Sequence, residues 1–338
     1  FKQILKIREL NLENLLFNVE IPLINVLIDI EFNGVFIDVN LIKKLSSDIK
    51  SDIQEVSQNI YNIAGKEFNL NSPLQLSVVL FDELQLKKIR KKSTSVEVLE
   101  KLKNYHPIIE LILRYRHLSK LVNTYLDTLP SFVNPKTNRV HTSFNQAVTS
   151  TGRLSSNKPN FQNIPIKSPI SKEIRKAFKA QNKNDVIISF DYSQIELRIL
   201  AHFSDEQNLI EAFNKDIDIH SRTAALIYGL TVEEVNENHR RVAKIINYSI
   251  VYGAGPYRIS QELKISIKEA SNIINNYFQR YPGIKRYIEN IIMDGTKNEY
   301  VNTILGRRRN TLNLRSSNRN IVEAEKRAAI NMPIQGSA

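Results

Sequence analysis

The stretch VIISFDYSQIELRILAH, residues Val186 to His202, predicts a strand that leads directly into a helix. Its first four residues, VIIS, form a short apolar run of the kind found in buried strands. Ser193 and Glu196 have the spacing of a capping box, so we expect the helix to begin at Ser193. Asp191 then lies at the turn, near the positive end of the helix dipole, where an ionised carboxylate can hold a hard cation. The alternative is that Asp191 only helps to cap the helix.

Length and composition narrow the class of protein. A chain of 338 residues is too long for most single cores and indicates two or three subdomains. Its net charge of +12 favours a polyanionic partner. The lack of cysteine fits a reducing compartment, here the cytoplasm, and excludes disulfides and cysteine-ligated zinc. No apolar run approaches the roughly 18 residues of a membrane span. The chain begins with Phe1 rather than Met and ends without a helix-stop signal, so we expect it to be cut from a longer protein.

The first 145 residues show mostly helical periodicity. We expect helices over 41–65, 73–84 and 106–129, a turn at Asn33-Gly34 and a strand over 140–144. The basic run KKIRKK, residues 87–92, is either a solvated loop or a contact to a phosphate backbone. Asp29 and Glu31 have the Asp-x-Glu form of some nuclease metal sites. The acids in reach follow an ordinary amphipathic pattern, however, so we expect a structural role for this pair.

Residues 149–165, TSTGRLSSNKPNFQNIP, are polar and irregular in composition. A segment of this kind inside a globular chain indicates either a disordered link or a working surface. Arg153, between Gly152 and Leu154, either reaches outward from this segment or pairs with a nearby carboxylate.

A second informative stretch, NHRRVAKIINYSIVYG, covers residues 238–253. Arg240, Lys244, Tyr248 and Tyr252 recur every four residues, which on a helix keeps all four within an arc of about 120°. The apolar residues between them form a stripe on the opposite side, expected to pack inward. Cations near a helix N-terminus oppose the helix dipole, which makes more sense if they bind a polyanion. A triphosphate on the cations and a base against the rings fit this spacing; the alternative is a basic surface helix with tyrosines at its packing boundary.

These stretches together resemble the family A DNA polymerases of the bacterial DNA polymerase I type. DYSQIELRILAH is similar to that family's motif A, and the ladder from Arg240 to Tyr252, followed by Gly253, is similar to its motif B. TGRLSS, PNFQNIP, DIH at 218–220, LGRRR at 305–309 and KRAAINMPIQGSA at the end also match, in the family's order. The resemblance covers the chain from about residue 19, and several independent motifs at proper spacing make it specific.

The resemblance implies a helix-rich α+β fold shaped like a hand, with an antiparallel palm sheet, helical fingers and a helical thumb. It assigns residues 19–45, 131–205 and 300–338 to the palm, which is incomplete at its C-terminal end. Residues 46–130 form the thumb and 206–299 the fingers, and residues 1–18 are a linker remnant of an upstream domain.

The resemblance also implies template-directed DNA synthesis in replication and repair, with addition of a deoxynucleotide to a primer 3′-hydroxyl and release of pyrophosphate. Two Mg²⁺ ions are the implied cofactors, held by Asp191 and the backbone carbonyl of Tyr192. Lys244 is the implied proton donor to pyrophosphate, and Glu196 excludes a ribose 2′-hydroxyl by its bulk. An Asp-x-His beside a helix, as at His220, is also commonly structural.

The partners implied are primer-template DNA and deoxynucleoside triphosphates, with no membrane, and the protein is expected to be a monomer. The implied nucleotide-binding residues are Gln194, Glu196, His220, Arg240, Lys244 and Tyr248. The implied DNA-binding residues are Arg153, Tyr252, Arg327, Asn331 and Gln335.

The sequence departs from the family pattern in three places. Tyr248 stands where most bacterial relatives carry Phe, so we expect weak discrimination against dideoxynucleotides. The thumb lacks the family's Gly-containing turn before STS at 93–95, which puts its grip on duplex DNA, and so its processivity, in doubt. The chain ends at Ala338, before motif C with its second metal-binding acid, which Asp205, Glu206 and Asp218 do not obviously replace. We therefore expect the whole protein to polymerise DNA, and this chain alone to give no primer extension with Mg²⁺ above background.

Two alternatives stay open. A phage-type single-subunit RNA polymerase shares the palm chemistry, although an enzyme that uses ribonucleotides needs a small residue in place of Glu196. The other alternative, from a different functional class, is a non-catalytic duplex-binding remnant of a polymerase.

Overall fold

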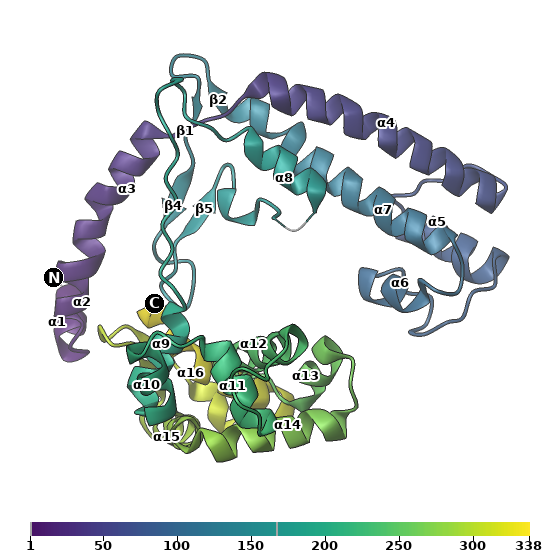
Figure 1. Ribbon diagram of the computed structural model, residues 1–338. Helices are drawn as coiled ribbons and strands as arrows, with labels where there is room; N and C mark the ends of the chain where they lie inside the picture. Colours follow the sequence, from purple (N-terminus) through teal and green to yellow (C-terminus); the bar gives the residue numbers. More distant parts are fainter. Residues whose placement is uncertain (1, 167) are drawn as a thin grey trace. The chain divides into compact units, whose positions relative to one another are not determined.

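The computed structural model describes residues 2–166 and 168–338, which divide into two compact units (Figure 1). Unit 1 contains the chain up to Val26, residues 145–155 and residues 189–338. Unit 2 contains residues 27–144 and 156–188. The border crosses the helix α3 (Ile21–Asn33), so each unit is assembled from segments that lie far apart in the sequence.

The long helix α4 (Val39–Ala64) organises unit 2. Its N-cap residue Asp38 accepts a hydrogen bond from the backbone N–H of Leu41 at 3.1 Å, and Gly65 ends the helix with a φ of +71°. α4 packs along α7 (Ile108–Leu121). The remaining helices are α5 (Pro73–Val78), α6 (Val96–Leu102) and α8 (Pro169–Lys176), with π-helical turns at Val79–Glu83 and Val122–Leu126. The three predicted helices in this region are therefore confirmed.

A small antiparallel sheet lies at one end of α4. It has the order β1-β3-β2, formed by β1 (Val35–Phe36), β3 (Arg139–Val140) and β2 (Val133–Asn134), and Val140 lies opposite both Val35 and Val133. The single strand predicted over 140–144 is divided between β3 and β4 (Ser143–Asn145), and β4 pairs with β5 (Ser155–Asn157). The carboxylate of Glu31 accepts a hydrogen bond from the backbone N–H of Phe144, which is a structural contact.

Unit 1 is mainly helical. Its N-terminal part holds α1 (Lys2–Glu9), α2 (Glu13–Leu15), a π-helical turn (Leu16–Glu20) and the first turns of α3. The larger part holds α9 (Ile195–Ser204), α10 (Gln207–Asn214), α11 (Ile219–Tyr228), α12 (Glu237–Val251), α13 (Pro256–Leu263), α14 (Ile267–Arg280), α15 (Pro282–Asn298) and α16 (Arg319–Ser337). The antiparallel hairpin of β6 (Tyr300–Asn302) and β7 (Arg308–Asn310) separates the last two helices.

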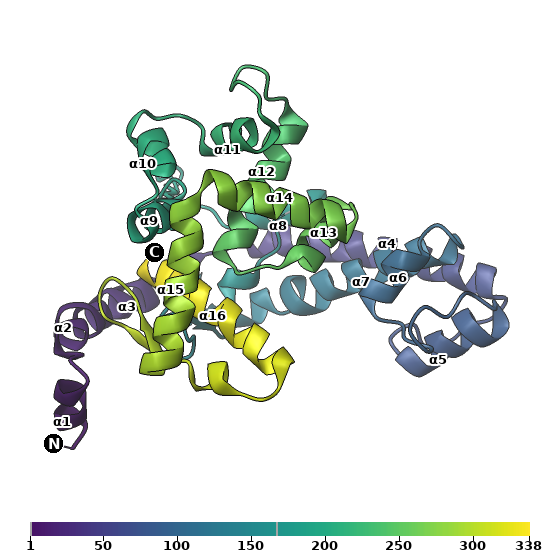
Figure 2. The ribbon, with the colours of Figure 1, turned by 90° about the horizontal axis from the view of Figure 1, so that it is seen from below.

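One apolar core fixes these helices relative to one another. Its buried members come from every helix from α9 to α16, and include Leu197, Ile246, Tyr277 and Ile284. α9, α15 and α16 pack against each other (Figure 2). α11 packs against both α12 and α14. The side chains on the outer faces of α9, α11 and α12 are therefore held on a rigid base.

The predicted strand over Val186–Ser189 is wrong. These residues have no regular secondary structure, and the side chains of Val186 and Ile188 are 77% and 66% exposed. A strand exists by hydrogen bonding to a neighbour, and among the described residues none pairs with this run. The run has the apolar, β-branched composition of a strand, but composition alone does not provide the neighbouring strand with which it would have to pair.

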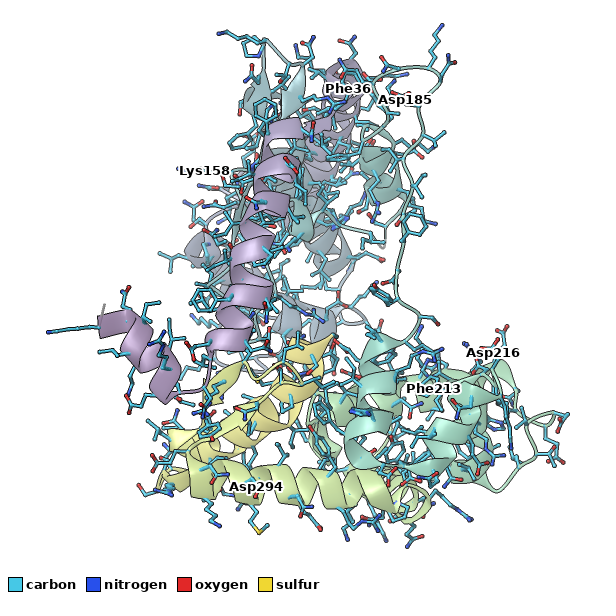
Figure 3. The ribbon with its side chains drawn as sticks, turned by 90° about the vertical axis from the view of Figure 1, so that its left-hand side faces the viewer. Phe36, Lys158, Asp185, Phe213, Asp216 and Asp294 are labelled. Carbon is cyan, nitrogen blue, oxygen red and sulfur yellow. The ribbon has the colours of Figure 1, made fainter. Side chains whose placement is uncertain are left out.

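Side chains on the surface of unit 1 include two exposed acids that lie outside its core. Asp216 follows α10, and Asp294 lies on the outer side of α15 (Figure 3). Phe213, near Asp216, is half-buried, with the guanidinium carbon of Arg198 4.6 Å from its ring centroid. Of the helices that the structure describes, none combines the length and the apolar character needed to cross a bilayer.

Candidate functional site

Asp191 lies in an exposed segment just before α9. The helix begins differently from the prediction, because Gln194 adopts a left-handed conformation (φ +53°) and no side chain caps the helix. The predicted capping box is therefore wrong. Its acid, Glu196, points its carboxylate at partners elsewhere in unit 1. Asp191 remains near the N-terminal end of α9 and is exposed to solvent.

The carboxylate of Glu196 is buried, with a residue exposure of 8%. Arg153 donates a hydrogen bond from Nη2 to Oε1 at 2.7 Å, and the Tyr252 hydroxyl donates to Oε2 at 3.1 Å. Arg153 thus pairs with a carboxylate, and its side chain also stays 54% exposed, so the structure is compatible with both roles considered for it. Burial, followed by the charge of Glu196, raises the pKa of the Tyr252 hydroxyl. Three residues from separate segments thus form one polar cluster beside α9.

The segment that carries Arg153 is anchored on its other side. Arg307 pairs with Glu20, and Glu20 also accepts a hydrogen bond at 3.0 Å from Nε2 of Gln146. Gly152, with a φ of +85°, lies directly under the Arg307 side chain, where an added Cβ would come within 2.2 Å of Nε. Glycine is needed here both for the backbone conformation and for the close approach. The contacts hold Arg153 where it reaches Glu196.

The predicted ladder on α12 is confirmed as helix geometry. Asn236 caps the helix by accepting a hydrogen bond from the His239 backbone N–H at 2.9 Å. Val242, Ile246 and Ile250 are buried in the core, whereas Arg240 and Lys244 are exposed and Tyr248 is half-buried. Gly253 ends the helix with a φ of +62° and lies so close to α16 that an added Cβ would be 2.9 Å from the Cα of Arg327.

The two ladder cations differ in their surroundings. The guanidinium of Arg240 pairs with Asp218 at 2.6 Å. Burial alone would raise the pKa of Asp218, but hydrogen bonds from Arg240 and from the Ser221 backbone lower it overall. Lys244 has no ion pair with any carboxylate that the structure describes. A pocket of about 550 Å³ is lined by Glu237, Asn238, Arg240, Arg241 and Lys244. It presents three cations from one helix face to an incoming anion.

A second pocket, of about 320 Å³, continues along the same helix. It is lined by Arg241, Lys244, Ile245, Tyr248, Ser249 and Tyr252 of α12 and its end, and by Arg258 and Glu262 of α13. Burial raises the pKa of the Tyr248 hydroxyl, and the charges of Glu196 and Asp191 raise it further. The negative charges of Glu196 and Asp191 therefore act on the Tyr248 end of the ladder, whereas the other end carries the cations.

His220 is buried at the beginning of α11, with an exposure of 2%. Its Nδ1 lies 3.2 Å from Nδ2 of Asn247, and its ring is 5.8 Å from that of Tyr248. Burial lowers the pKa of His220 to about 4, against a raising effect of Asp218 and further lowering by Arg240 and Lys244. The imidazole is consequently neutral at physiological pH.

This shift makes the stability of unit 1 depend on pH. The folded-state pKa of about 4 lies below the unfolded value of 6.5, so the unfolded chain binds more protons between these values. Stability is then lost as the pH falls through this window. Between pH 7.5 and pH 5 we expect His220 to contribute a loss of about 2 kcal/mol in the free energy of unfolding. Urea unfolding of the wild type and of His220→Gln at both pH values measures it; an equal loss in both proteins contradicts the assignment.

On α16, Arg327, Asn331 and Gln335 follow one another at four-residue spacing and share a face. Arg327 is exposed and lines a pocket of about 610 Å³ together with Gly255, Tyr257, Arg258 and Gln261. Asn331 is half-buried, and its Nδ2 has no hydrogen-bond partner among the described residues. A buried donor without a partner is costly in a folded protein, so this amide is suited to a ligand.

The acids near the site differ in their freedom to bind a metal. Glu206 is buried and accepts a hydrogen bond from the Gly283 backbone N–H at 2.7 Å, Asp218 is paired with Arg240, and Glu196 is paired with Arg153. Asp191 is exposed, and no group of three or more acids or histidines suited to a metal occurs among the described residues. A single carboxylate fits Mg²⁺, which is commonly bound by one or two carboxylates together with substrate phosphates.

Three residues of the site escaped the sequence reasoning. Arg241 and Arg258 line the pockets, and Asn247 contacts His220. Arg241 adjoins Arg240 and was detectable as part of the same basic cluster. Asn247 lies on the inward side of α12. Its polar side chain within an apolar stripe is the one feature of the sequence that could have indicated a role for it.

Comparison with known proteins gives consistent matches. The model of DNA polymerase family A matches residues 39–338. DNA polymerase I of Bacillus caldotenax is 47% identical over 331 residues, which are 96% of this chain and 38% of the relative. The thermostable DNA polymerase I of Thermus aquaticus is 45% identical over 326 residues, 95% of this chain and 39% of the relative.

Among solved structures, the POL domain of Pol1 from M. smegmatis, in complex with DNA primer-template and dNTP, is similar with a TM-score of 0.88 and 37% identity. The match covers 98% of this chain and 59% of that one. The chain thus has the helix-rich α+β polymerase fold, and it spans under two fifths of the length of the two relatives named above. On the extent of the family match and the level of identity, the chain belongs to DNA polymerase family A.

Proposed function

We propose that the protein of which this chain is a part synthesises DNA on a template. It adds deoxynucleotides to a primer 3′-hydroxyl and releases pyrophosphate, in replication or repair. The observation that carries the proposal is the face of α12, where exposed cations are followed by two tyrosines. The exposed carboxylate of Asp191 acts by its charge on one of these, raising the pKa of Tyr248. The similar M. smegmatis POL domain was solved with primer-template and dNTP, the ligands proposed for this protein.

The chemistry calls for two Mg²⁺ ions, which lower the pKa of the attacking hydroxyl and neutralise charge on the leaving pyrophosphate. Asp191 would hold them, assisted by the backbone carbonyl of Tyr192. Arg240, Lys244 and His220 bind the triphosphate, and Lys244 donates a proton to pyrophosphate. Arg241 adds a third cation to the same pocket. Gln194, next to this turn, also contacts the nucleotide.

The arrangement around Glu196 suits selection of the sugar. Its side chain is buried and held from two sides by Arg153 and Tyr252, so it cannot swing away easily. A rigid group rejects a ribose 2′-hydroxyl better than a mobile one, because avoiding the clash would require breaking these hydrogen bonds. Tyr248 and Tyr252 offer ring faces to the base and the template.

The face of α16 suits the minor groove of the new base pair. Arg327, Asn331 and Gln335 carry donors, and every correct pair presents N3 or O2 acceptors there. Donors of this kind check pair geometry without reading sequence. Arg153 joins them while paired with Glu196. The basic run at 87–92 would add phosphate contacts, each steepening the dependence of log K on log salt by about 0.9.

The parts of the hand are inferred as follows: thumb 46–130, fingers 206–299, and palm 19–45, 131–205 and 300–338. The protein acts as a cytoplasmic monomer. The two alternatives predict other outcomes, since an RNA polymerase would prefer ribonucleotides and a duplex-binding remnant would bind DNA without extending it.

The test is single-nucleotide primer extension by the whole protein with Mg²⁺, offering each of the four deoxynucleotides alone on four templates. We expect the template base to decide which nucleotide is added. Binding of the duplex without extension contradicts the proposal and favours the remnant, and preferred use of ribonucleotides favours the RNA polymerase.

Tyr248 leads to a prediction about chain terminators. Its hydroxyl can replace the missing 3′-hydroxyl of a dideoxynucleotide, so we expect the whole protein to use dideoxy and deoxy substrates at similar rates. Tyr248→Phe removes one hydrogen bond and should increase discrimination roughly tenfold to a hundredfold. Competition between the two substrates in single-turnover assays measures it, with Tyr257→Phe, on the exposed face of α13, as the control. Strong and equal discrimination in both Tyr248 forms refutes the role.

A further inference from the structure

A chain of buried polar groups runs inward from the ladder of α12. Asn247, which is 1% exposed, directs Nδ2 towards Nδ1 of His220 at 3.2 Å and towards Oγ1 of Thr223 at 3.1 Å. Oγ1 of Thr223 lies 2.9 Å from the hydroxyl of Tyr281. The contacts connect α11, α12 and the residue before α15, in the interior of one packed core.

The orientation of the Asn247 amide, with Nδ2 facing Nδ1, decides which ring nitrogen of His220 carries the proton. An amide nitrogen only donates, so Nδ1 of His220 must accept and the ring proton lies on Nε2. The reverse orientation would present the amide oxygen to Nδ1 and leave Nε2 as an acceptor. An acceptor at Nε2 would repel the oxygens of a phosphate, whereas an N–H attracts them. Nε2 has no hydrogen-bond partner in the part of the chain that the structure describes.

Charged groups around the ring explain why a neutral donor suits this position. Arg240 and Lys244 of α12 act against a positive charge on His220, and Asp218 at the start of α11 favours it. The Asp218 carboxylate is already paired with Arg240. Tyr248 packs beside the ring, and Tyr281 lies at the far end of the polar chain. The cations of α12 thus supply the positive charge that attracts a phosphate, and a neutral His220 can add a directional hydrogen bond to it.

We propose that Asn247 is a positioning residue that holds His220 as the Nε2–H tautomer, so that His220 donates a hydrogen bond to a nucleotide phosphate. Asn247 acts by orienting His220 and does not itself contact the nucleotide. It rests on the proposed function for the identity of the ligand, but the tautomer is a property of the protein alone. The two are therefore separable by experiment.

The tautomer is measured by ¹⁵N NMR of the histidine side chains in this chain, with His220 assigned from His220→Gln. We expect Nδ1 of His220 to resonate as an unprotonated nitrogen and Nε2 as a protonated one at pH 7. Asn247→Asp replaces the donor by a group that only accepts, so the proton should move to Nδ1. Asn276→Asp, on the exposed face of α14, should leave the tautomer unchanged. A wild-type protein with the proton on Nδ1 overturns the inference without any variant.

Binding of dATP separates positioning from a general structural role. We expect Asn247→Ala, which removes the donor without adding a charge, to weaken dATP binding about tenfold, the loss of one charge-assisted hydrogen bond. In a His220→Gln background the same change should have no further effect. Additive losses in the double variant overturn the positioning role. If the wild type binds no dATP, the proposed function fails, while the NMR result still decides the tautomer.

Discussion

We expect Asp191→Asn to reduce the rate of nucleotide incorporation by the whole protein by at least about a thousandfold, or roughly 4 kcal/mol in the activation barrier. The substitution keeps the size of the side chain and removes the charge that would hold Mg²⁺. Glu196, Glu206 and Asp218 already have partners in the fold, so none is free to take over. Single-turnover incorporation at saturating dNTP measures the effect.

Asp216→Asn is the matched control for this prediction. Asp216 is an exposed acid in the loop after α10, away from the core (Figure 3). It undergoes the same chemical change and should keep the wild-type rate. Because Asp191 is exposed, its substitution should also leave the unfolding free energy within about 0.5 kcal/mol of the wild type. Near-normal incorporation by Asp191→Asn contradicts the metal role, and a large loss of stability would assign the residue to helix capping.

The second large effect concerns Glu196. We expect Glu196→Ala to improve the use of ribonucleotides relative to deoxynucleotides by roughly a hundredfold or more, because a steric block of a few kcal/mol is removed. Glu196→Gln separates bulk from charge, since it keeps the size and can still accept hydrogen bonds from Arg153 and Tyr252. It should therefore retain most of the exclusion. Competition between a ribonucleotide and its deoxy counterpart gives the ratio.

The outcomes of the Glu196 experiment also decide between enzymes. Unchanged ribonucleotide use in the alanine variant shows that the side chain does not guard the sugar. A wild-type protein that already prefers ribonucleotides favours the RNA polymerase alternative. If the alanine and glutamine variants lose discrimination against ribonucleotides equally, the charge of Glu196 rather than its bulk is the selective property.

The sequence predicted best where local periodicity determines structure. α4 and α12 have apolar stripes at helical spacing, ended by Gly65 and Gly253, and both formed as expected. The prediction failed where structure depends on a distant partner. Val186–Ser189 has strand composition, but no described residue pairs with it. Glu196 has capping-box spacing, yet its carboxylate bonds to Arg153 and Tyr252, which are 43 and 56 residues away.

The candidate site shows the same division. The arc of cations and tyrosines on α12 followed from spacing alone. The pairing of Arg240 with Asp218 and the contact between His220 and Asn247 join different helices, and helix packing decides which residues meet. Local spacing therefore identifies the candidate groups on one helix face, and only the packed core reveals how each is oriented.

The central claim is that Asp191 anchors divalent ions opposite the cations and rings of α12. The most direct measurement is a crystal structure of the whole protein with Mg²⁺, a dideoxy-terminated primer-template and the complementary dNTP. We expect a carboxylate oxygen of Asp191 at about 2.1 Å from Mg²⁺, with the triphosphate oxygens contacting Arg240 and Lys244. A ternary complex in which Asp191 binds no metal, or in which the triphosphate lies away from α12, contradicts the account.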